Sequence, residues 1–423
     1  RVKALIINVH SSKNAGDRAI LEASLKHIRS EFGEIDISIC TNWPEEDWTF
    51  TAAKIVPSVW WLVGNTQRKP VWRQIINALR WYLVGLLPGV VFLIPKSWRQ
   101  TLQAYREADV VIAIGGNQFY STGKWGWPFP LTALGTWLAN RYKKPLYILP
   151  QSIGPLKRGW ERTLLRKIYG RACLVFLRDQ ISLHLAEEIG LPGQIVGYAP
   201  DSAFDFSAGM EDTAQTILEA YGFHPGQAAV GMSVIASMGH SLDKTQVANY
   251  YSVSAAVLER LISVLGAQVF LFNQVTGPTQ IENDANGAQE VFQRMKNNQG
   301  LHLVNEALPP SILKSCYGKM DLMIASRLHS GIFSLGMHVP TVFIGYLTKT
   351  RGMLRTLGLE HWGLDIQKMT ESSLYDLVNE AWEGRSAYRM QLEALMPVVA
   401  ALSREAVHAI KVDFQSITTS KPF

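Results

Sequence analysis

The stretch "DLMIASRLHSGIFSLGMHVPTVFIGY", residues 321–346, indicates the fold class of this chain. Its first apolar run has no polar alternation, which is typical of a parallel strand covered on both faces. Arg327 and His329 stand at the end of that run, "HSGIFSLG" predicts a helix, and "PTVFIGY" predicts a second strand. A strand, a helix and a strand in this order predict a βαβ unit with a right-handed crossover.

The same alternation recurs along the chain. In the first half, "ALIINV", "ADVVIAIGG", "PLYILPQSIGP" and "CLVFLRD" each precede a segment with helical spacing. The pattern breaks near residues 199–213, where turn-forming residues gather, and it restarts with "AAVGMSVIA", "AQVFLFNQV" and "DLMIAS". The expected helices are residues 131–142, 246–265 and 284–297, and "WERTLLRKIYG" and "ISLHLAEEIG".

This alternation predicts an α/β protein of two Rossmann-like domains that face each other across a cleft. A chain of 423 residues is too long for one ordinary core, which also favours two domains. We expect an N-terminal domain over residues 1–205 and a C-terminal domain over residues 206–370. Helices within residues 371–423 would strap the halves together.

Composition narrows the classes of partner. Hydrophobic residues make up 47% of the chain and charged residues 18%, which is enough apolar material for sizeable cores. The net charge of +6 suits an anionic small molecule or an anionic membrane surface. There is no dense basic run with interleaved aromatic residues in the sequence, so nucleic acid is not an expected partner.

The three cysteines, Cys40, Cys173 and Cys316, are far apart in the sequence. Without a CxxC motif or a Cys/His cluster, neither a disulfide framework nor a zinc site is expected. The sequence also lacks HExxH, GxSxG, GxGxxG and EF-hand motifs, so no metal and no cofactor are expected. No secretory signal is recognisable at the start of the sequence, so a reducing cytoplasm is the expected compartment.

An insertion over about residues 43–99 departs from the alternation. Residues 81–95, "WYLVGLLPGVVFLIP", carry no charge, but a membrane span needs about 20 residues. Flanking cations and seven of the 13 tryptophans are typical of an interfacial membrane contact. The alternative is a hairpin packed on the N-terminal domain or on a second subunit. The cations are Arg68, Lys69, Arg73, Arg80, Lys96 and Arg99, and the tryptophans are Trp43, Trp48, Trp60, Trp61, Trp72, Trp81 and Trp98.

Arg327 and His329 are the first candidates for chemistry. Ligands of open α/β sheets bind beyond the carboxyl ends of the strands, where a helix N-terminus favours an anion. Ser326 and Arg327 would occupy this strand exit, and the planar guanidinium suits phosphate or carboxylate. His329 is the side chain best suited to move a proton near neutral pH. The alternative is a structural ion pair for Arg327 and a helix cap for His329.

Four other strand exits carry polar or flexible residues. In "NAGDRAI", Asn14, Gly16 and Asp17 form a strand-to-helix turn in which Asp17 either caps the helix or binds sugar hydroxyls. In "IGGNQF", the paired glycines either let a ligand approach or only make the turn. The other candidates are Gln151 and Ser152 in "PQSIGP", and Lys349, which either reaches a phosphate or lies solvated at the surface.

Two further charged residues stand beside predicted buried strands. Arg178 ends "CLVFLR", where an unpaired charge would be costly. It either pairs with Asp179 or Asp201 or faces the same anion as Arg327. Asp284 opens the helix after "VFLFNQV", where it is a helix cap, a base or a sugar ligand.

Taken in order, these segments resemble the polysaccharide pyruvyl transferase family from about residue 4 to residue 363. The block "SRLHS…SLGMHVP…IGY…K" carries the most specific part of the resemblance. The segments, in chain order, are "NAGDRAILEASL", "IAIGGNQF", "PQSIGPL", "VFLRDQIS", "APDSAF" and "ASRLHSGIFSLGMHVPTVFIGYLTKT".

The resemblance implies a fold similar to the two-domain GT-B glycosyltransferases. It implies phosphoenolpyruvate as co-substrate, with no other cofactor, and a sugar of a cell-surface glycan, often lipid-linked, as acceptor. The product would be a pyruvate ketal, with release of phosphate. The N-terminal domain would take the acceptor and the C-terminal domain the donor. The enzyme would work in the cytoplasm or at the inner face of the cytoplasmic membrane, and a homo-oligomer is a further expectation.

In the family's motif the arginine and the histidine are the functional pair, and they match Arg327 and His329. We expect His329 to act as the acid and Asp17 to accept the proton of the sugar. The residues expected at the donor are Arg327, Arg178, Lys349, Ser326, Gly115 and Gly116, and those expected at the acceptor are Asn14, Asp17, Asn117, Gln151 and Asp284.

Two other functions fit the same architecture. A GT-B nucleotide-sugar glycosyltransferase also places cations over phosphate, but no ribose-binding carboxylate stands out in the C-terminal half. A non-catalytic glycan-binding or membrane-scaffold protein would keep the fold without needing His329. The clustered cations favour the transferase over this second alternative.

Overall fold

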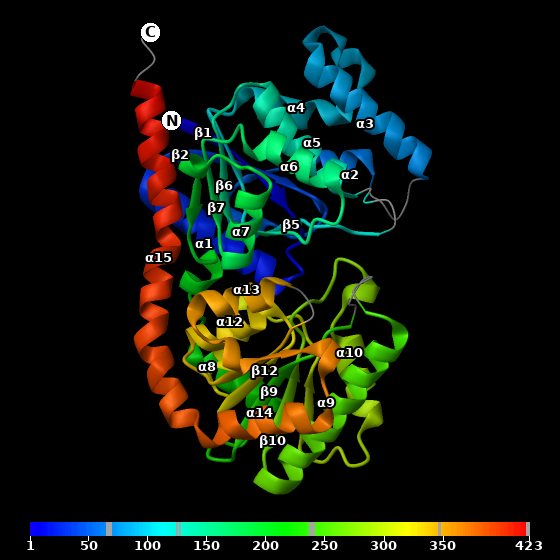
Figure 1. Cartoon of the computed structure of the whole chain (residues 1–423), viewed down its shortest axis with the longest axis vertical. Helices are drawn as coiled ribbons and strands as arrows, with labels where there is room; N and C mark the ends of the chain where they lie inside the picture. The colour runs from blue at the N-terminus through cyan, green and yellow to red at the C-terminus, as the bar shows by residue number, and fades with distance from the viewer. Residues whose placement is uncertain (65–69, 124–125, 127, 237–241, 346–347, 420–423) are drawn as a thin grey trace. The chain divides into compact units, whose positions relative to one another are not determined.

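The computed structural model describes residues 1–64, 70–123, 126, 128–236, 242–345 and 348–419. The chain forms two compact units (Figure 1). Unit 1 contains Arg1–Ser12, Ile20–Ser202 and Leu402–Phe423, and unit 2 contains Lys13–Ala19 and Ala203–Ala401. These units differ from the predicted domains in two places. Residues 13–19 group with unit 2, and the predicted C-terminal segment, residues 371–423, is divided between the units at Leu402.

Unit 1 is built on one sheet whose strands all pair in parallel. The strand order is β3-β2-β1-β4-β6-β7-β8. Strand β5 stands outside this order and pairs with β6. The central strands are buried along their length, as the unbroken apolar runs predict. The strands are β1 (Val2–Val9), β2 (Ile35–Thr41), β3 (Lys54–Pro57), β4 (Val110–Ala113), β5 (Gly116–Phe119), β6 (Leu146–Ile153), β7 (Leu174–Leu177) and β8 (Val196–Tyr198).

The helices of unit 1 bury apolar side chains against this sheet in one large core. They confirm the predicted strand-helix alternation, with boundaries shifted by a few residues. The helices are α1 (Ala15–Phe32), α2 (Val59–Val63), α3 (Val71–Leu86), α4 (Arg99–Glu107), α5 (Pro128–Arg141), α6 (Gly159–Tyr169) and α7 (Gln180–Glu188), with the short 3-10 helices η1 (Thr49–Thr51), η2 (Pro88–Leu93), η3 (Lys96–Trp98) and η4 (Gly193–Ile195).

Unit 2 also has a parallel sheet, in the order β11-β10-β9-β12-β13-β14. Numbered within the unit, this is the 3-2-1-4-5-6 order of the Rossmann fold, in which the strand order reverses between the first and fourth strands. Here those strands are β9 and β12. The strands are β9 (Ala229–Ser233), β10 (Gln268–Phe272), β11 (Leu301–Val304), β12 (Leu322–Ala325), β13 (Thr341–Gly345) and β14 (Gly363–Asp365).

The helices of unit 2 complete a second core around this sheet. Residues 321–346 form the predicted strand, helix and strand, because β12, α12 and β13 follow one another here. The helices are α8 (Glu211–Ala220), α9 (Lys244–Leu265), α10 (Ala285–Arg294), α11 (Pro310–Tyr317), α12 (Leu328–Gly336), α13 (Thr348–Leu357) and α14 (Glu371–Glu383), with η5 (Ser202–Asp205), η6 (Gln280–Glu282), η7 (Glu360–Trp362) and η8 (Ile366–Lys368).

The C-terminal helical stretch consists of α14 and the long α15 (Arg385–Thr419), separated at Gly384. Helix α15 is divided between the units: residues before Leu402 belong to unit 2 and the rest to unit 1. In unit 2, the Tyr388 hydroxyl donates to the Thr341 carbonyl at 3.0 Å. In unit 1, the Tyr147 hydroxyl donates to the Asp413 carboxylate at 2.7 Å. One helix therefore makes polar contacts within both units.

The apolar insertion is not the hairpin that residues 81–95 predict. Its first part is the C-terminal end of α3, and η2 follows. Trp81 is fully buried and stacks on Trp98 with ring centroids 5.8 Å apart, whereas Trp72 is 57% exposed. The other four tryptophans are buried or half-buried, so six of the seven serve packing. Of the flanking cations, Arg68 and Lys69 lie outside the described residues.

No helix in the described part of the chain is both long enough and apolar enough to cross a membrane.

Candidate functional site

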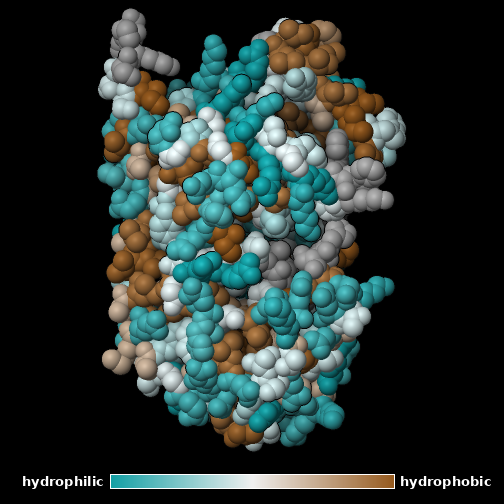
Figure 2. All heavy atoms as spheres, viewed as in Figure 1, coloured by the Kyte–Doolittle hydropathy of each residue, from teal (hydrophilic) through white to brown (hydrophobic). Residues whose placement is uncertain are grey.

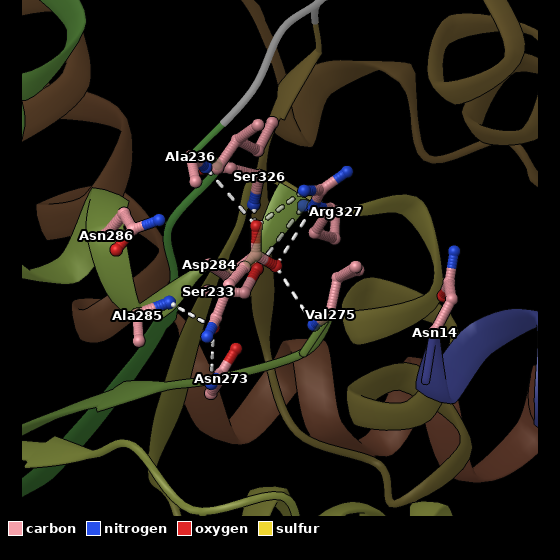
Figure 3. Close-up of polar contacts among 12 residues, drawn as sticks. Asn14, Ser233, Ala236, Asn273, Val275, Asp284, Ala285, Asn286, Ser326 and Arg327 are labelled. Atoms are coloured by element: carbon pink, nitrogen blue, oxygen red, sulfur yellow. Dashed lines mark hydrogen bonds and ion pairs between the residues drawn. The ribbon is translucent and has the colours of Figure 1, made fainter. Parts of the chain in front are cut away.

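A polar cluster of unit 2 lies where β9 and β12 end. The Ser233 hydroxyl, at the end of β9, accepts the backbone N–H groups of Ser326 at 3.1 Å and Arg327 at 3.3 Å (Figure 3). The same hydroxyl lies 2.6 Å from that of Ser330 in α12. These bonds join the two strand ends at the point where a Rossmann sheet binds its ligand.

Arg327 forms a two-point ion pair with Asp284, which lies just before α10. Its Nε donates to Asp284 Oδ2 at 3.1 Å and its Nη2 donates to Oδ1 at 2.5 Å. The carboxylate also accepts the backbone N–H groups of Ala236 at 3.3 Å and Val275 at 3.1 Å. In Figure 3 the other terminal nitrogen of Arg327 is directed away from Asp284. The pair therefore fixes the plane of the guanidinium.

This contact changes the interpretation of Asp284. The side chain is buried and does not cap α10, although it stands at the cap position. Burial raises the pKa of the Asp284 carboxyl, and the Arg327 charge with the two backbone N–H groups opposes that rise. The structure thus supports a positioning role for Asp284, while its contact with an acceptor sugar stays a prediction.

His329 lies in the first turn of α12 and is buried, with 8% of its surface exposed. The helix begins after Arg327, whose side chain makes no capping hydrogen bond. The imidazole packs on the backbone of Gly16, because a Cβ added to Gly16 would lie 2.2 Å from His329 Nδ1. A glycine is therefore required beside this histidine.

The first turn of α1 is held in unit 2 by residues 274–276. Asn14 and Val275 form an antiparallel β-bridge, and the Ala15 N–H donates to the Gln274 carbonyl at 3.1 Å. The Asn14 side chain caps α1 by accepting the N–H groups of Gly16 at 3.0 Å and Asp17 at 3.4 Å.

The prediction that Asp17 caps this helix is therefore wrong, because Asn14 is the cap. Asp17 is half-buried, and its carboxylate makes no hydrogen bond or ion pair within the described ranges. Its neighbour Gly16 contacts His329. The two sequence motifs that were singled out independently, "NAGD" and "SRLHS", are thus brought together.

Sequence reasoning assigned no role to three residues of this cluster. The Tyr250 hydroxyl, on α9, donates to Ser326 Oγ at 2.8 Å, so Ser326 is an interior residue. Gln274 is buried, and its Oε1 accepts the Tyr317 hydroxyl at 2.6 Å, whereas its Nε2 has no partner among the described residues. Ser233 could have been found as a polar residue at a strand exit. Gln274 carries the same signal, because it stands at the end of the predicted strand "VFLFNQ", whereas Tyr250 lies inside a helix and carries none.

Lys349 stands in the first turn of α13 and is half-buried. It follows β13, the neighbour of β12 in the sheet. Its contact with a donor phosphate stays a prediction, and so does that of Ser326.

In unit 1, backbone geometry accounts for the paired glycines after β4. A Cβ on Gly115 would lie 2.7 Å from the Pro150 carbonyl oxygen, and Gly116 has a φ of +128°, which favours glycine. Asn117 follows on β5, where it is half-buried, and its Oδ1 is buried with no hydrogen bond to the described chain. Asn117 is therefore the residue of this turn whose side chain could contact a ligand.

Gln151 and Arg178 lie inside unit 1. The Gln151 amide donates to the Ile114 carbonyl at 2.8 Å, and its oxygen accepts the Tyr169 hydroxyl at 2.6 Å. Arg178 forms a buried ion pair with Asp201, which was one of its two predicted partners, and its Nε donates to Ser152 Oγ at 2.9 Å. These contacts support internal roles, and binding of donor or acceptor by the two residues stays a prediction.

Metal-ligating side chains are dispersed in the part of the chain that the structure describes. No group of three or more His, Cys, Asp or Glu residues there is placed to hold a metal ion. The chemistry of the unit 2 cluster instead suits an anion, because it combines an oriented guanidinium with a helix N-terminus. An imidazole in the same turn can supply or take a proton.

Comparison with solved structures shows a fold shared with two-domain, GT-B-like sugar-nucleotide enzymes. A putative UDP-N-acetylglucosamine 2-epimerase from Listeria monocytogenes matches with a TM-score of 0.61 and 13% identity, covering 96% of this chain and 94% of that one. MnaA from S. aureus, solved with UDP, matches with a TM-score of 0.64 and 13% identity, covering 100% and 99%.

Sequence comparison identifies the family. The family model for polysaccharide pyruvyl transferase matches residues 14–348, so this chain belongs to that family and is a transferase. The amylovoran biosynthesis protein AmsJ from Erwinia amylovora is 24% identical over 390 residues, covering 89% of this chain and 91% of that protein. The matched range begins at Asn14 and ends beside Lys349, so it contains the whole unit 2 cluster.

Proposed function

We propose that this protein transfers the pyruvyl group of phosphoenolpyruvate to a sugar of a cell-surface glycan. The product is a pyruvate ketal bridging two sugar oxygens, and inorganic phosphate is released. The single observation that supports this most is the contact between Gly16 and the His329 ring. The imidazole packs on Gly16, and the next residue, Asp17, has a carboxylate without a hydrogen bond or ion pair among the described residues.

The donor carries a phosphate and a carboxylate on one small carbon frame, so it needs cations held in fixed directions. Asp284 orients the Arg327 guanidinium by two hydrogen bonds. The N-terminus of α12 has no side-chain cap and adds a favourable dipole for an anion. Arg327 would bind one anionic group of the donor, with Lys349 as the second cation.

His329 would act as the general acid. Its place in the first turn of α12 puts the imidazole beside Arg327, the residue proposed to hold the anionic donor. The packing on Gly16 holds the ring in one orientation.

The reaction begins when His329 protonates the vinyl CH2 carbon of phosphoenolpyruvate, which makes C2 electrophilic. A sugar hydroxyl adds to C2, and Asp17 takes the proton of that hydroxyl. The bond between C2 and the phosphate oxygen then breaks, and a second hydroxyl of the sugar adds to C2 and closes the ketal ring. Its proton leaves with the phosphate, so atoms and charges balance without an oxidant or reductant.

The acceptor and compartment rest on two further observations. The printed name of AmsJ concerns biosynthesis of the polysaccharide amylovoran, which favours an exopolysaccharide, or its lipid-linked precursor, as acceptor here. The cysteines Cys40, Cys173 and Cys316 are all free thiols, which suits a reducing cytoplasm.

The test is an incubation with phosphoenolpyruvate and a panel of lipid-linked oligosaccharides, followed by mass spectrometry and a phosphate assay. We expect each acceptor molecule to gain the mass of one pyruvate less one water, with one phosphate released per transfer. Parallel incubations contain UDP-sugars instead of phosphoenolpyruvate. Transfer from the UDP-sugars alone would make the protein a nucleotide-sugar transferase and would refute the proposal.

A further inference from the structure

Helix α3 presents an apolar face that the described residues of unit 1 leave exposed. Seven of its large apolar side chains are between 40% and 58% exposed, and Leu87 and Phe92, just beyond the helix, are 57% and 70% exposed. Figure 2 shows the corresponding brown patch at the upper right, over α3. We name these nine residues the α3 face; they are Val71, Trp72, Ile75, Ile76, Leu79, Tyr82, Leu83, Leu87 and Phe92.

The opposite side of α3 is firmly packed. Trp81 and Val84 are fully buried, and Gly85 is so close to the ring of Trp137 on α5 that an added Cβ would lie 2.5 Å away. At 100° per residue, the exposed apolar residues of the helix share one continuous stripe, and Arg73 and Arg80 lie along its edge. The α3 face is therefore held outward by the packing of the helix.

An apolar groove of about 630 Å³ continues this surface between α3, α5 and α6. Two exposed cations of α6 and its end, Lys167 and Arg171, border it. The residues that form its floor and walls include Ile75, Leu79, Tyr82, Leu134, Trp137 and Leu164. A chain of methylene groups fits the chemistry of this groove, and a phosphate fits the cations at its border.

The charge around this surface is of one sign. Residues 48–160 contain 14 Lys and Arg but only two acidic residues, Glu107 and Asp109, whereas the rest of the chain contains 27 basic and 33 acidic residues. The positive net charge of the protein therefore comes from this segment alone. No carboxylate within the described ranges pairs with the exposed cations nearest the α3 face, which are Arg73, Arg80, Lys96, Arg99, Arg141, Lys167 and Arg171.

We propose that the α3 face docks on an anionic phospholipid membrane. The apolar stripe would enter the boundary between headgroups and acyl chains, with an acyl chain in the groove, and the surrounding cations would bind headgroup phosphates. Pairing of the same face in two copies of this chain would bring two strongly positive surfaces together. Charge complementarity therefore selects the lipid surface over a second copy. The proposal does not depend on the reaction proposed above.

The test is co-sedimentation of the purified protein with vesicles of phosphatidylethanolamine and phosphatidylglycerol, compared with vesicles of phosphatidylcholine alone. We expect binding only to the anionic vesicles, with strong weakening in 0.5 M salt, which screens exposed charges. The triple variant Trp72→Ser/Leu79→Ser/Phe92→Ser and the double variant Arg73→Glu/Arg80→Glu should each lower vesicle binding at least tenfold.

Matched controls use residues equally exposed elsewhere. Met210→Ser/Ile281→Ser/Met390→Ser removes three side chains that are 70–74% exposed in unit 2, and Lys368→Glu reverses an exposed charge there. Both should bind vesicles as the parent chain does, and every variant should keep the circular dichroism spectrum and urea midpoint of the parent chain. Equal vesicle binding by parent and α3 variants would overturn the proposal. So would a parent dimer that the triple variant converts to a monomer, because a second copy would then cover the face.

Discussion

The two units each place an arginine at the exit of a buried strand, yet the helix that follows begins differently. In unit 1, Asp179 caps α7 by accepting the Ser182 N–H at 2.8 Å, and Arg178 beside it is buried against Asp201. In unit 2, Arg327 itself stands at the cap position of α12, and its side chain does not cap. Its side chain is 17% exposed, against 4% for Arg178.

The difference concerns which group satisfies the helix N-terminus. An aspartate at the cap supplies an internal anion, so the helix after β7 has no need of a ligand. An arginine at the cap supplies no such anion. Under the proposed function the anionic donor would take that role, and the guanidinium would be a second positive group to attract it. Both arginines have a buried carboxylate partner, so the ion pair alone does not distinguish a structural arginine from a functional one.

The largest expected effect concerns His329. His329 stands two residues after Arg327, and Gln180 stands two residues after Arg178. The variant His329→Gln therefore gives unit 2 the residue that unit 1 has at the corresponding position. We expect kcat to fall about 10²–10⁴-fold with little change in KM for phosphoenolpyruvate, because a general acid is lost while donor contacts remain. Steady-state phosphate release measures both constants.

The control for this variant is His361→Gln, which alters an exposed histidine of unit 2 that contacts Glu380. It should keep the activity of the parent chain. A His329→Gln enzyme with unchanged kcat would remove the proposed acid and, with it, the functional contrast between the two units.

Paired variants test the two arginines against each other. Arg178→Met should destabilise the chain by about 3–5 kcal/mol, since Asp201 is left as an uncompensated buried charge. Arg178→Met/Asp201→Asn should restore most of that stability together with full activity. Arg327→Met/Asp284→Asn should restore stability in the same way but lose about 10²–10³-fold in kcat/KM, because the group that faces the donor is gone.

Urea unfolding and phosphate release, run on all the single and double variants, separate the two roles. If the two double variants behaved alike in both measurements, the arginines would be equivalent and the comparison between the units would fail.

A smaller effect is expected from Gly16→Ala. The new methyl group would lie 2.2 Å from His329 Nδ1, so the imidazole must move from its position. A shift of about 1 Å in a catalytic group costs about 10²-fold in rate. The matched control is Gly159→Ala in α6, where an added Cβ meets no atom within 4 Å. Equal kcat values for the two variants would show that the position of His329 is unimportant.

The smallest effect concerns Lys314, a third buried cation, whose Nζ donates to the Phe206 carbonyl at 2.6 Å. Burial lowers the pKa of Lys314 to about 8, and Asp205 opposes the shift. Because an unfolded lysine has a pKa of about 10.4, the unfolded chain binds more protons between these values. The contribution of Lys314 to the free energy of unfolding therefore rises as the pH increases through this window.

Relative to Lys314→Met, the parent chain should gain about 2–3 kcal/mol of stability between pH 7 and pH 10. Urea unfolding at the two pH values measures this gain, and Lys368→Met, at an exposed lysine, is the control. If the difference in unfolding free energy between the parent chain and Lys314→Met did not change with pH, the carbonyl partner would stabilise the charged Lys314 fully. Lys314 would then resemble Arg178 and Arg327, which have carboxylate partners.

Much of the fold and part of the site could be predicted from local pattern. Unbroken apolar runs followed by helical spacing located the parallel strands, and polar residues at their ends marked Arg327, His329 and Arg178. The pairing of Arg178 with Asp201 was one of two predicted pairings, since a buried charge needs a nearby partner. These inferences succeed because strand burial and charge burial act over short stretches of chain.

The other contacts could not be predicted in this way. Asp284 lies 43 residues from Arg327, and the order of strands in the sheet brings the two together. Gly16 lies still further from His329, and the bridge between Asn14 and Val275 holds its turn in unit 2. The same holds for the insertion. The sequence pointed to residues 81–95 and to a tryptophan cluster, but packing buries Trp81 and Trp98 and leaves Trp72 and Phe92 outside.

The sequence by itself determined that this chain forms parallel α/β units and that an arginine and a histidine stand at one strand exit, because hydrophobic periodicity and residue chemistry are local properties. The tertiary structure alone decided which aspartate orients Arg327, which glycine supports His329 and which face of α3 remains exposed. Those outcomes depend on strand order and side-chain packing, which join residues far apart in the chain.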